Sequence, residues 1–123
     1  MKGNAIRWFE IYVQDMPRAR AFYETVFQVR LEKLEGPDGE MLAFPMVPDQ
    51  PGCGGAIVKM GGVPSGGNST VVYFASEDCA VEAARVAAAG GRLEREKMSI
   101  GPYGFIALAF DPDGNMFGIH SMQ

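Results

Sequence analysis

This sequence of 123 residues has no cluster of basic residues, only two cysteines and no long apolar run. Lys and Arg number 11 against 15 Asp and Glu, which gives a formal net charge of −4 at pH 7. Binding to nucleic acid depends on clustered Lys and Arg that release counterions from phosphates, so nucleic acid is not expected as a partner. No apolar run approaches the roughly 20 residues needed to cross a bilayer, so no membrane partner is expected either.

The two cysteines, Cys53 and Cys79, are too few for a disulfide scaffold. Residues 1–4 lead directly into a strand pattern, without the apolar core of a signal peptide. Both observations predict a protein of the reducing cytoplasm. Cys79 is expected near a helix start beside an alanine-rich stripe, which favours a buried structural thiol over a reactive one. No role is assigned to Cys53.

The sequence does contain one pattern of strands and helix that occurs twice. The first copy is expected to hold a strand over 6–13, a helix from about Pro17 capped by Asp15, and strands over 29–34, 41–47 and 56–60. Residues 61–68, rich in glycine, form the expected linker. The second copy is expected to hold a strand over 69–75, a helix over about 80–89 that Gly90 and Gly91 end, and strands over 92–98, 107–110 and 116–122.

An internal repeat supports this division. An offset of 62 places Arg30-Leu31-Glu32 on Arg92-Leu93-Glu94 and Gly52 on Gly114, which we interpret as a tandem duplication. The predicted fold class is α+β: two tandem βαβββ modules (about 4–61 and 69–123) in a single domain, 1–123, forming a concave eight-stranded mixed sheet with the helices on its outer face. The concave face, called the cup in this subsection, is a natural small-ligand site.

Open module edges are commonly closed by another chain, so a homodimer is expected. Whether the modules pair within one chain or by exchange between chains stays open. The most informative turn, Asp111-Pro112-Asp113-Gly114-Asn115, lies between the last two strands. Pro112 suits the second position of a tight turn, and Gly114 is expected to take a positive φ. A similar turn is expected over 36–39.

Several of these features together resemble the vicinal oxygen chelate superfamily, which includes glyoxalase I, bleomycin-resistance proteins and extradiol dioxygenases. The features are Asp15 followed by Ala21-Phe22-Tyr23 and Val26-Phe27, the 62-residue repeat, and the closing turn 111–115. The resemblance covers essentially the whole chain. It implies paired βαβββ modules, frequently a dimer, and in the enzymes of the family a divalent metal in the cup that polarises vicinal oxygens of the substrate.

The resemblance places the family's metal-ligand positions on Trp8, Ala56, Thr70 and Gly118. Indole nitrogen only donates, alanine and glycine carry no donor atoms for a metal, and a neutral threonine hydroxyl is a poor ligand. Glu10 and His120 each follow one of these positions by two residues, but one Glu and one His fall short of the three or four ligands of a tight zinc site. We therefore expect no metal and no other cofactor.

Glu10 and His120, the only histidine, are the catalytic candidates, since a carboxylate and an imidazole that both point into the cup can act as acid and base. The alternative is that Glu10 pairs with a neighbouring Arg or with water, and that His120 is a partly exposed strand residue. Which of the two holds stays open at this point.

The ligand-binding candidates are mostly apolar or aromatic side chains expected to line the cup. They are Trp8, Tyr12, Phe44, Thr70, Val72 and Phe74, with Met46 as a further possibility and Tyr103, between Gly101 and Gly104, as a lid residue. The same side chains could instead fill the cup as core, and Tyr103 could belong to a fixed turn.

Three functions agree with these observations. The leading one is a glyoxalase-like small-molecule-binding protein without a metal, whose cup takes an apolar or aromatic ligand, with enzymatic activity left open. The second is a metal-dependent lyase or dioxygenase acting on vicinal oxygens. The third is a drug-sequestering resistance protein of the bleomycin-binding type.

Overall fold

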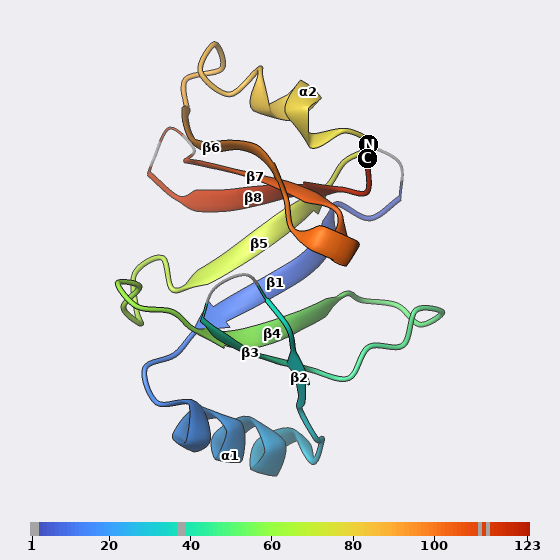
Figure 1. The fold of residues 1–123 in the computed structure, drawn as a ribbon, viewed down its shortest axis with the longest axis vertical. Helices are drawn as coiled ribbons and strands as arrows, with labels where there is room; N and C mark the ends of the chain where they lie inside the picture. Colours follow the sequence, from blue (N-terminus) through green and yellow to red (C-terminus); the bar gives the residue numbers. More distant parts are fainter. Residues whose placement is uncertain (1–2, 37–38, 111, 113) are drawn as a thin grey trace. The chain divides into compact units, whose positions relative to one another are not determined.

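The computed structural model describes residues 3–36, 39–110, 112 and 114–123. The expected order of strands and helices, βαβββ twice, is present (Figure 1). The elements are β1 (Ile6–Tyr12), α1 (Met16–Phe27), β2 (Glu32–Leu34), β3 (Glu40–Ala43), β4 (Gly54–Lys59), β5 (Thr70–Ala75), α2 (Cys79–Ala83), β6 (Arg92–Ser99), β7 (Phe105–Phe110) and β8 (Met116–Ser121), with a short 3-10 turn at Gly101–Tyr103.

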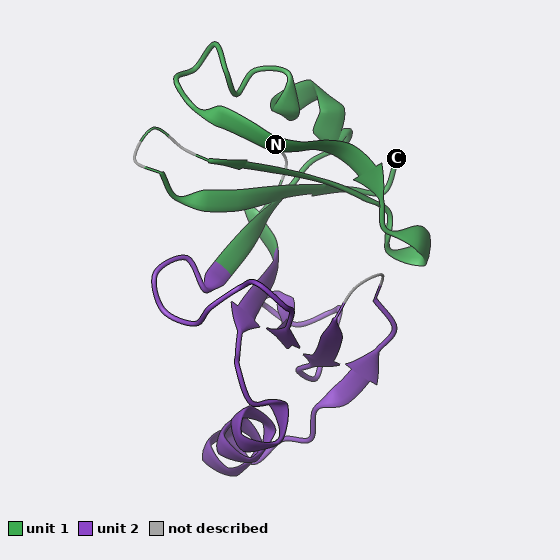
Figure 2. Ribbon diagram, turned by 60° about the vertical axis from the view of Figure 1, so that its left-hand side comes forward, with its two compact units in different colours: residues 1–7, 71–123 green, residues 8–70 purple. Residues whose placement is uncertain are grey.

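The eight strands form a mixed sheet, so the predicted α+β class is confirmed. The chain divides into two compact units (Figure 2): unit 1 comprises residues 1–7 and 71–123, and unit 2 comprises residues 8–70. The strand order is β2-β3-β4-β1 in the first half of the chain and β5-β8-β7-β6 in the second. In each half the first and last strands pair in parallel, β1 with β4 and β5 with β8, and the other neighbours are antiparallel.

In unit 2, α1 covers one face of the strands. Asp15 caps the helix as predicted, because its carboxylate accepts a hydrogen bond from the backbone N–H of Arg18 at 3.0 Å. Met16, Ala19 and Tyr23 of the helix then pack on the sheet, whereas Phe22, Val26 and Phe27 stay exposed. The core beneath it contains Met16, Leu31, Leu42 and Ile57, with Ile11, Val13, Ala19, Tyr23, Val29 and Phe44 packed against them.

In unit 1, α2 is shorter than the predicted helix over 80–89. It ends at Ala83, and residues 84–90 form irregular turns. Alanine favours helix, but a helix this short depends on packing for its stability, and the exposed Ala84, Ala87 and Ala88 bury little. The core under α2 contains Cys79, Ala83, Ala107 and Ile119, with Leu93, Phe105 and Phe117 packed against them. Cys79 is fully buried, in agreement with the structural interpretation, and Cys53 is exposed.

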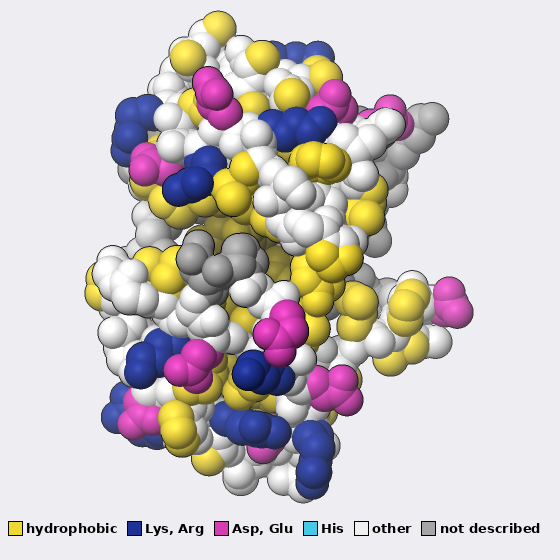
Figure 3. Space-filling model, viewed as in Figure 1, with side chains coloured by type: hydrophobic (Ala, Val, Ile, Leu, Met, Phe, Trp, Pro, Cys, Tyr) yellow, Lys and Arg dark blue, Asp and Glu magenta, His cyan; other side chains and the backbone are white. Residues whose placement is uncertain are grey.

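The two predicted tight turns are described only in part. Gly39 and Gly114 have φ values of +70° and +86°, so the positive φ expected at Gly114 is confirmed. Pro37, Asp38, Asp111 and Asp113 lie outside the described residues. No helix in the described part of the chain is long and apolar enough to cross a membrane. On the face seen in Figure 3, acidic and basic side chains are interspersed and do not separate into patches of one sign.

Candidate functional site

The β1 strand presents its two faces to different surroundings. Phe9 and Ile11 point to the α1 side, where the Phe9 ring lies 5.7 Å from the ring of Phe44. Because side chains alternate along a strand, Trp8, Glu10 and Tyr12 lie on the face opposite α1. The sequence predicted this alternation correctly.

On that face, Glu10 is held by the two aromatic side chains next to it. The indole Nε1–H of Trp8 donates to Glu10 Oε2 at 3.1 Å, and the hydroxyl of Tyr12 donates to Glu10 Oε1 at 2.8 Å. Glu10 is only 7% exposed, whereas Trp8 and Tyr12 are half-buried. The arrangement is an oriented carboxylate flanked by aromatic surface, all supplied by one strand.

The protonation of Tyr12 follows from this contact. Burial, followed by the charge of Glu10 and the hydrogen bond to it, raises the pKa of the Tyr12 phenol above its usual value of 10.0. The phenol therefore remains a hydrogen-bond donor at neutral pH and well into the alkaline range.

The neighbouring strand β4 contributes almost no side-chain bulk beside Glu10. Gly54 is the parallel partner of Trp8, and Ala56 is the partner of Glu10. A Cβ on Gly54 would collide with the sulfur of Met46 and contact the Trp8 ring, so both side chains already occupy that space. Met46 is itself 63% exposed, and a flexible thioether beside an indole is a surface that adapts to different ligands.

On β5, the structure corrects the predicted orientation of three candidates. The ring of Phe74 lies 5.7 Å from that of Phe117, which belongs to the core under α2. By alternation, Thr70 and Val72 share the face of Phe74. These three side chains therefore point to the α2 side, whereas Tyr73 takes the opposite face.

The cause is a difference of one residue in the spacing between the two copies of the repeat. Glu10 pairs with Ala56, and Tyr73 pairs with Gly118. Ala56 and Gly118 are 62 residues apart, but Glu10 and Tyr73 are 63 apart. A gap-free offset therefore assigns β5 to the wrong face, because a shift of one residue exchanges the two faces of a strand. Sequence reasoning missed Tyr73 for this reason.

Phe44 also lies elsewhere than predicted. Its ring meets that of Tyr23 from α1 edge-on, with centroids 5.6 Å apart, and it packs against the core of unit 2. It is thus a core residue on the α1 side, as in the alternative that the sequence left open.

His120 lies in unit 1, on the face of β8 opposite the core residue Ile119. Its Nε2 is 2.6 Å from the backbone carbonyl of Tyr103. A carbonyl only accepts, so Nε2 carries the proton and donates. Nδ1 is buried and has no hydrogen-bond partner among the residues that the structure describes. The contact joins two predicted site residues, although it uses the backbone of Tyr103, whose side chain is 43% exposed.

The residues at the family's metal positions do not fit a metal ion. The Trp8 indole donates to Glu10, and Ala56 is fully buried. A Cβ on Gly118 would overlap the ring of Tyr73, so the space of a ligand side chain is already filled there. Over residues 3–36, 39–110, 112 and 114–123, no group of three or more His, Cys, Asp or Glu side chains could hold an ion.

Two βαβββ halves joined in one mixed sheet define the glyoxalase class of fold. The chain belongs to the Glyoxalase/Bleomycin resistance protein/Dioxygenase superfamily, whose sequence pattern matches residues 5–119. The resemblance inferred from the sequence is thereby confirmed.

Curated relatives include CFP32 of Mycobacterium bovis and of Mycobacterium tuberculosis, whose name assigns it provisionally to the glyoxylases. Each is 33% identical over 112 residues, which is 91% of this chain and 42% of the relative. The chain thus spans about two fifths of the length of these relatives.

Solved structures show the same fold at low identity. The protein BH1468 of Bacillus halodurans superposes with a TM-score of 0.71 at 11% identity, over 99% of this chain and 96% of the other. Methylmalonyl-CoA epimerase of Streptomyces coelicolor, in complex with 2-nitronate-propionyl-CoA, gives 0.68 at 12%, over 96% of both chains. The epimerase of Mycobacterium tuberculosis gives 0.67 at 12%, over 97% of this chain and 88% of the other.

Proposed function

We propose that this chain is a small-molecule-binding protein of the glyoxalase superfamily that holds its ligand on the β1 face bearing Trp8, Glu10 and Tyr12, without a metal ion. The observation that carries the proposal is the Glu10 carboxylate, which is 7% exposed and oriented by two aromatic donors. Its orientation is set before any ligand arrives, which lowers the entropic cost of binding.

The chemistry of this face defines the ligand class. A carboxylate only accepts hydrogen bonds, so the group of a ligand that meets Glu10 is a donor. The half-buried rings of Trp8 and Tyr12 and the thioether of Met46 offer apolar contact. The ligand is therefore an apolar or aromatic molecule bearing a hydroxyl or N–H group.

Catalysis is a second possibility that Glu10 supports. An oriented carboxylate can act as a general base toward a ligand proton within hydrogen-bond reach. The names of the relatives, a glyoxylase and an epimerase, are enzyme names. We propose Glu10 as the base if the protein is an enzyme, with His120 as a separate candidate in unit 1.

The alternative of a metal-dependent lyase or dioxygenase is disfavoured by the donor set described above. A drug-sequestering role of the bleomycin-binding type uses the same face and differs only in the absence of turnover. A cytoplasmic location is proposed from the two free thiols, Cys53 and Cys79, which a reducing compartment preserves.

The test uses Trp8, the only tryptophan of the chain, as a reporter inside the site. Addition of 4-propylphenol should shift or quench Trp8 emission in a saturable way. Its methyl ether 4-propylanisole, which lacks the donor, should bind at least about tenfold more weakly, because a hydrogen bond to a charged group contributes about 1.5–3 kcal/mol.

Glu10→Gln should weaken that preference for the phenol, because a neutral amide oxygen is a weaker acceptor than a carboxylate, whereas Glu77→Gln, a change of an exposed carboxylate in unit 1, should leave it intact. Equal affinities for the two compounds in the unchanged protein would contradict the assignment of Glu10 as the ligand's acceptor. Turnover of a bound hydroxy compound, lost in Glu10→Gln but with binding retained, would favour the enzymatic alternative over sequestration.

A further inference from the structure

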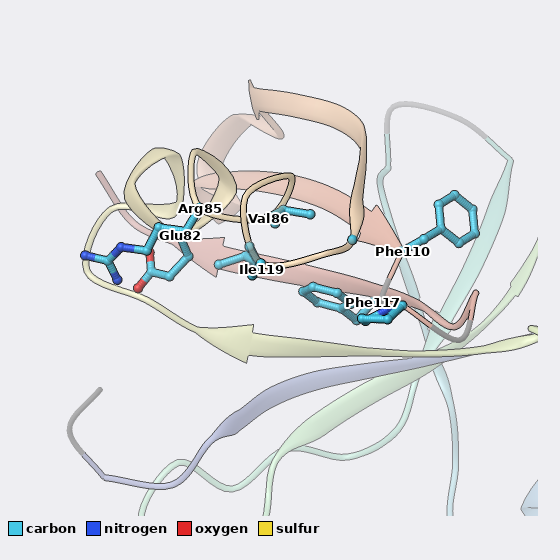
Figure 4. A pocket seen from close by; sticks show the side chains of 9 residues that line it. Glu82, Arg85, Val86, Phe110, Phe117 and Ile119 are labelled. Carbon is cyan, nitrogen blue, oxygen red and sulfur yellow. The ribbon is translucent and has the colours of Figure 1, made fainter.

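A cavity of about 290 Å³ lies in unit 1, on the α2 side of the sheet. It is separate from the β1 face described above and is formed within residues 82–119. Its lining includes Arg85, Val86, Ala89, Phe117 and Ile119. In Figure 4, Val86 and Ile119 lie in the middle, Glu82 and Arg85 at one end, and Phe110 and Phe117 at the other.

The tandem repeat explains why space remains here. The helix caps Asp15 and Asp78 are 63 residues apart, as are Glu10 and Tyr73, so Tyr23 corresponds to Val86. In unit 2 the ring of Tyr23 packs against the core under α1. In unit 1 the smaller side chain of Val86 stands at this position and lines the cavity.

The lining is apolar except at one end. Glu82 is engaged there, because its Oε1 accepts a hydrogen bond from the Ser76 hydroxyl at 2.6 Å. Arg85 is exposed, and its guanidinium has no ion pair or hydrogen bond within the described part of the chain. The combination is an apolar cleft with a cation at its mouth.

We propose that this cleft binds a small aromatic carboxylate, with its ring system against Val86, Phe117 and Ile119 and its carboxylate on Arg85. The size is suitable, since an apolar cavity of about 150 Å³ binds benzene and this one is nearly twice as large. The guanidinium matches a carboxylate in both charge and planar geometry. The proposal is independent of the function proposed for the β1 face.

The probe is 2-naphthoate, with methyl 2-naphthyl ketone as its neutral counterpart. In methyl NMR spectra, 2-naphthoate should shift the Val86 and Ile119 signals in a saturable way, while the indole N–H signal of Trp8 in unit 2 stays unchanged. Arg85→Gln should weaken 2-naphthoate roughly fivefold, the upper range for an exposed ion pair, and leave the ketone unaffected.

Ala89→Phe places an aromatic ring in the lining of the cavity, and should weaken both compounds at least about tenfold. Ala87→Phe adds the same ring at an exposed position outside the lining and should have no effect. If Ala89→Phe lowers the melting temperature strongly, Ala89→Leu replaces it.

Three results would overturn the proposal: no saturable shift of Val86 and Ile119, equal loss of binding in the Ala87 and Ala89 variants, or a response of Trp8 in place of the two methyl groups. The last result would assign the carboxylate to the β1 face. Conversely, a reduced preference for the phenol in Glu10→Gln with intact naphthoate binding would separate the two sites.

Discussion

At the scale of single residues, the hydrogen bonds of Glu10 are the feature on which the proposed function depends. A buried carboxylate is stable only where it is hydrogen-bonded, and Trp8 and Tyr12 supply two of the hydrogen bonds of Glu10. They also orient the carboxylate on one strand face. The same two contacts that stabilise Glu10 would, in the proposed function, hold it ready for a ligand.

Ionisation of Tyr12 in the folded protein should require a more alkaline solution than that of a free phenol, which a spectrophotometric titration of the unchanged chain against Tyr12→Phe measures. Its pKa in the folded state is raised above the usual 10.0, first by burial and then by Glu10. The associated stabilisation is therefore complete below about pH 10 and is lost as the pH rises above that value. Chemical denaturation measured across this range should show a steeper loss of stability than in Tyr12→Phe.

Tyr23→Phe is the matched control, because the Tyr23 hydroxyl has no comparable contact with a carboxylate among the described hydrogen bonds. Ionisation of Tyr12 at its ordinary pH in the folded protein, or identical pH profiles for Tyr12→Phe and the unchanged chain, would contradict the contact.

At the scale of elements, the close approach of β5 and β8 explains why residue 118 is a glycine. The enzymes of the family are expected to carry a metal ligand at this position. Gly118 pairs with Tyr73, whose ring fills the space above it. A side chain at 118 and the ring of Tyr73 are mutually exclusive in this geometry. The ring of Tyr73 therefore occupies the space that the side chain of a metal ligand at position 118 would need.

Gly118→Ala should lower the free energy of unfolding by about 1–3 kcal/mol, the usual cost of overpacking a buried site. The added methyl would overlap the Tyr73 ring. Gly61→Ala is the control, since nothing lies within 4 Å of its added Cβ, and it should change stability by no more than about 0.5 kcal/mol. Denaturant unfolding of both variants measures the two free energies of unfolding, and equal values would show that Tyr73 does not occupy this space.

The elements also show which parts of the structure are predictable from sequence and which are not. The cap at Asp15 and the positive φ at Gly114 follow from local chemistry, and both were predicted correctly. The face on which each β5 side chain lies depends on how β5 pairs with β8. The spacing of the repeat changes here by one residue, which exchanges the two faces, and no local sequence signal marks that change. Likewise, a phenylalanine at position 44 is compatible with either face of the sheet. Its packing against Tyr23 shows that it lies on the α1 side.

The short α2 illustrates the same limit. Alanine-rich residues 84–89 have high helix propensity, but the helix ends at Ala83. The first copy carries Tyr23, which packs on the core under α1, where the second has the smaller Val86. Sequence propensity predicted the longer helix, but it carries no information on the packing that a helix of this length needs.

At the scale of the whole molecule, exposed apolar side chains on α1 favour self-association. Phe22, Val26 and Phe27 are 58%, 54% and 60% exposed, and such a cluster on one helix is typical of an interaction surface. Another apolar group lies in the loop between β3 and β4, where Met46 and Val47 are 63% and 60% exposed.

We expect a homodimer in solution that uses the α1 surface. Light scattering coupled to size-exclusion chromatography should give twice the mass of one chain. Phe22→Glu should reduce this to the monomer mass, because a buried charge without a partner opposes association. Thr25→Glu, an exposed change on the same helix, should keep the dimer. A monomeric unchanged chain, or a dimer that survives Phe22→Glu, would contradict this surface.

The central claim is that a ligand binds at Glu10 without a metal ion, and a titration of Trp8 emission with 4-propylphenol before and after metal removal tests it most directly. Protein treated with a chelator and dialysed, and the same protein with zinc or manganese restored, should give the same dissociation constant and the same preference over 4-propylanisole. Binding that vanishes on chelation and returns with the metal would contradict the claim.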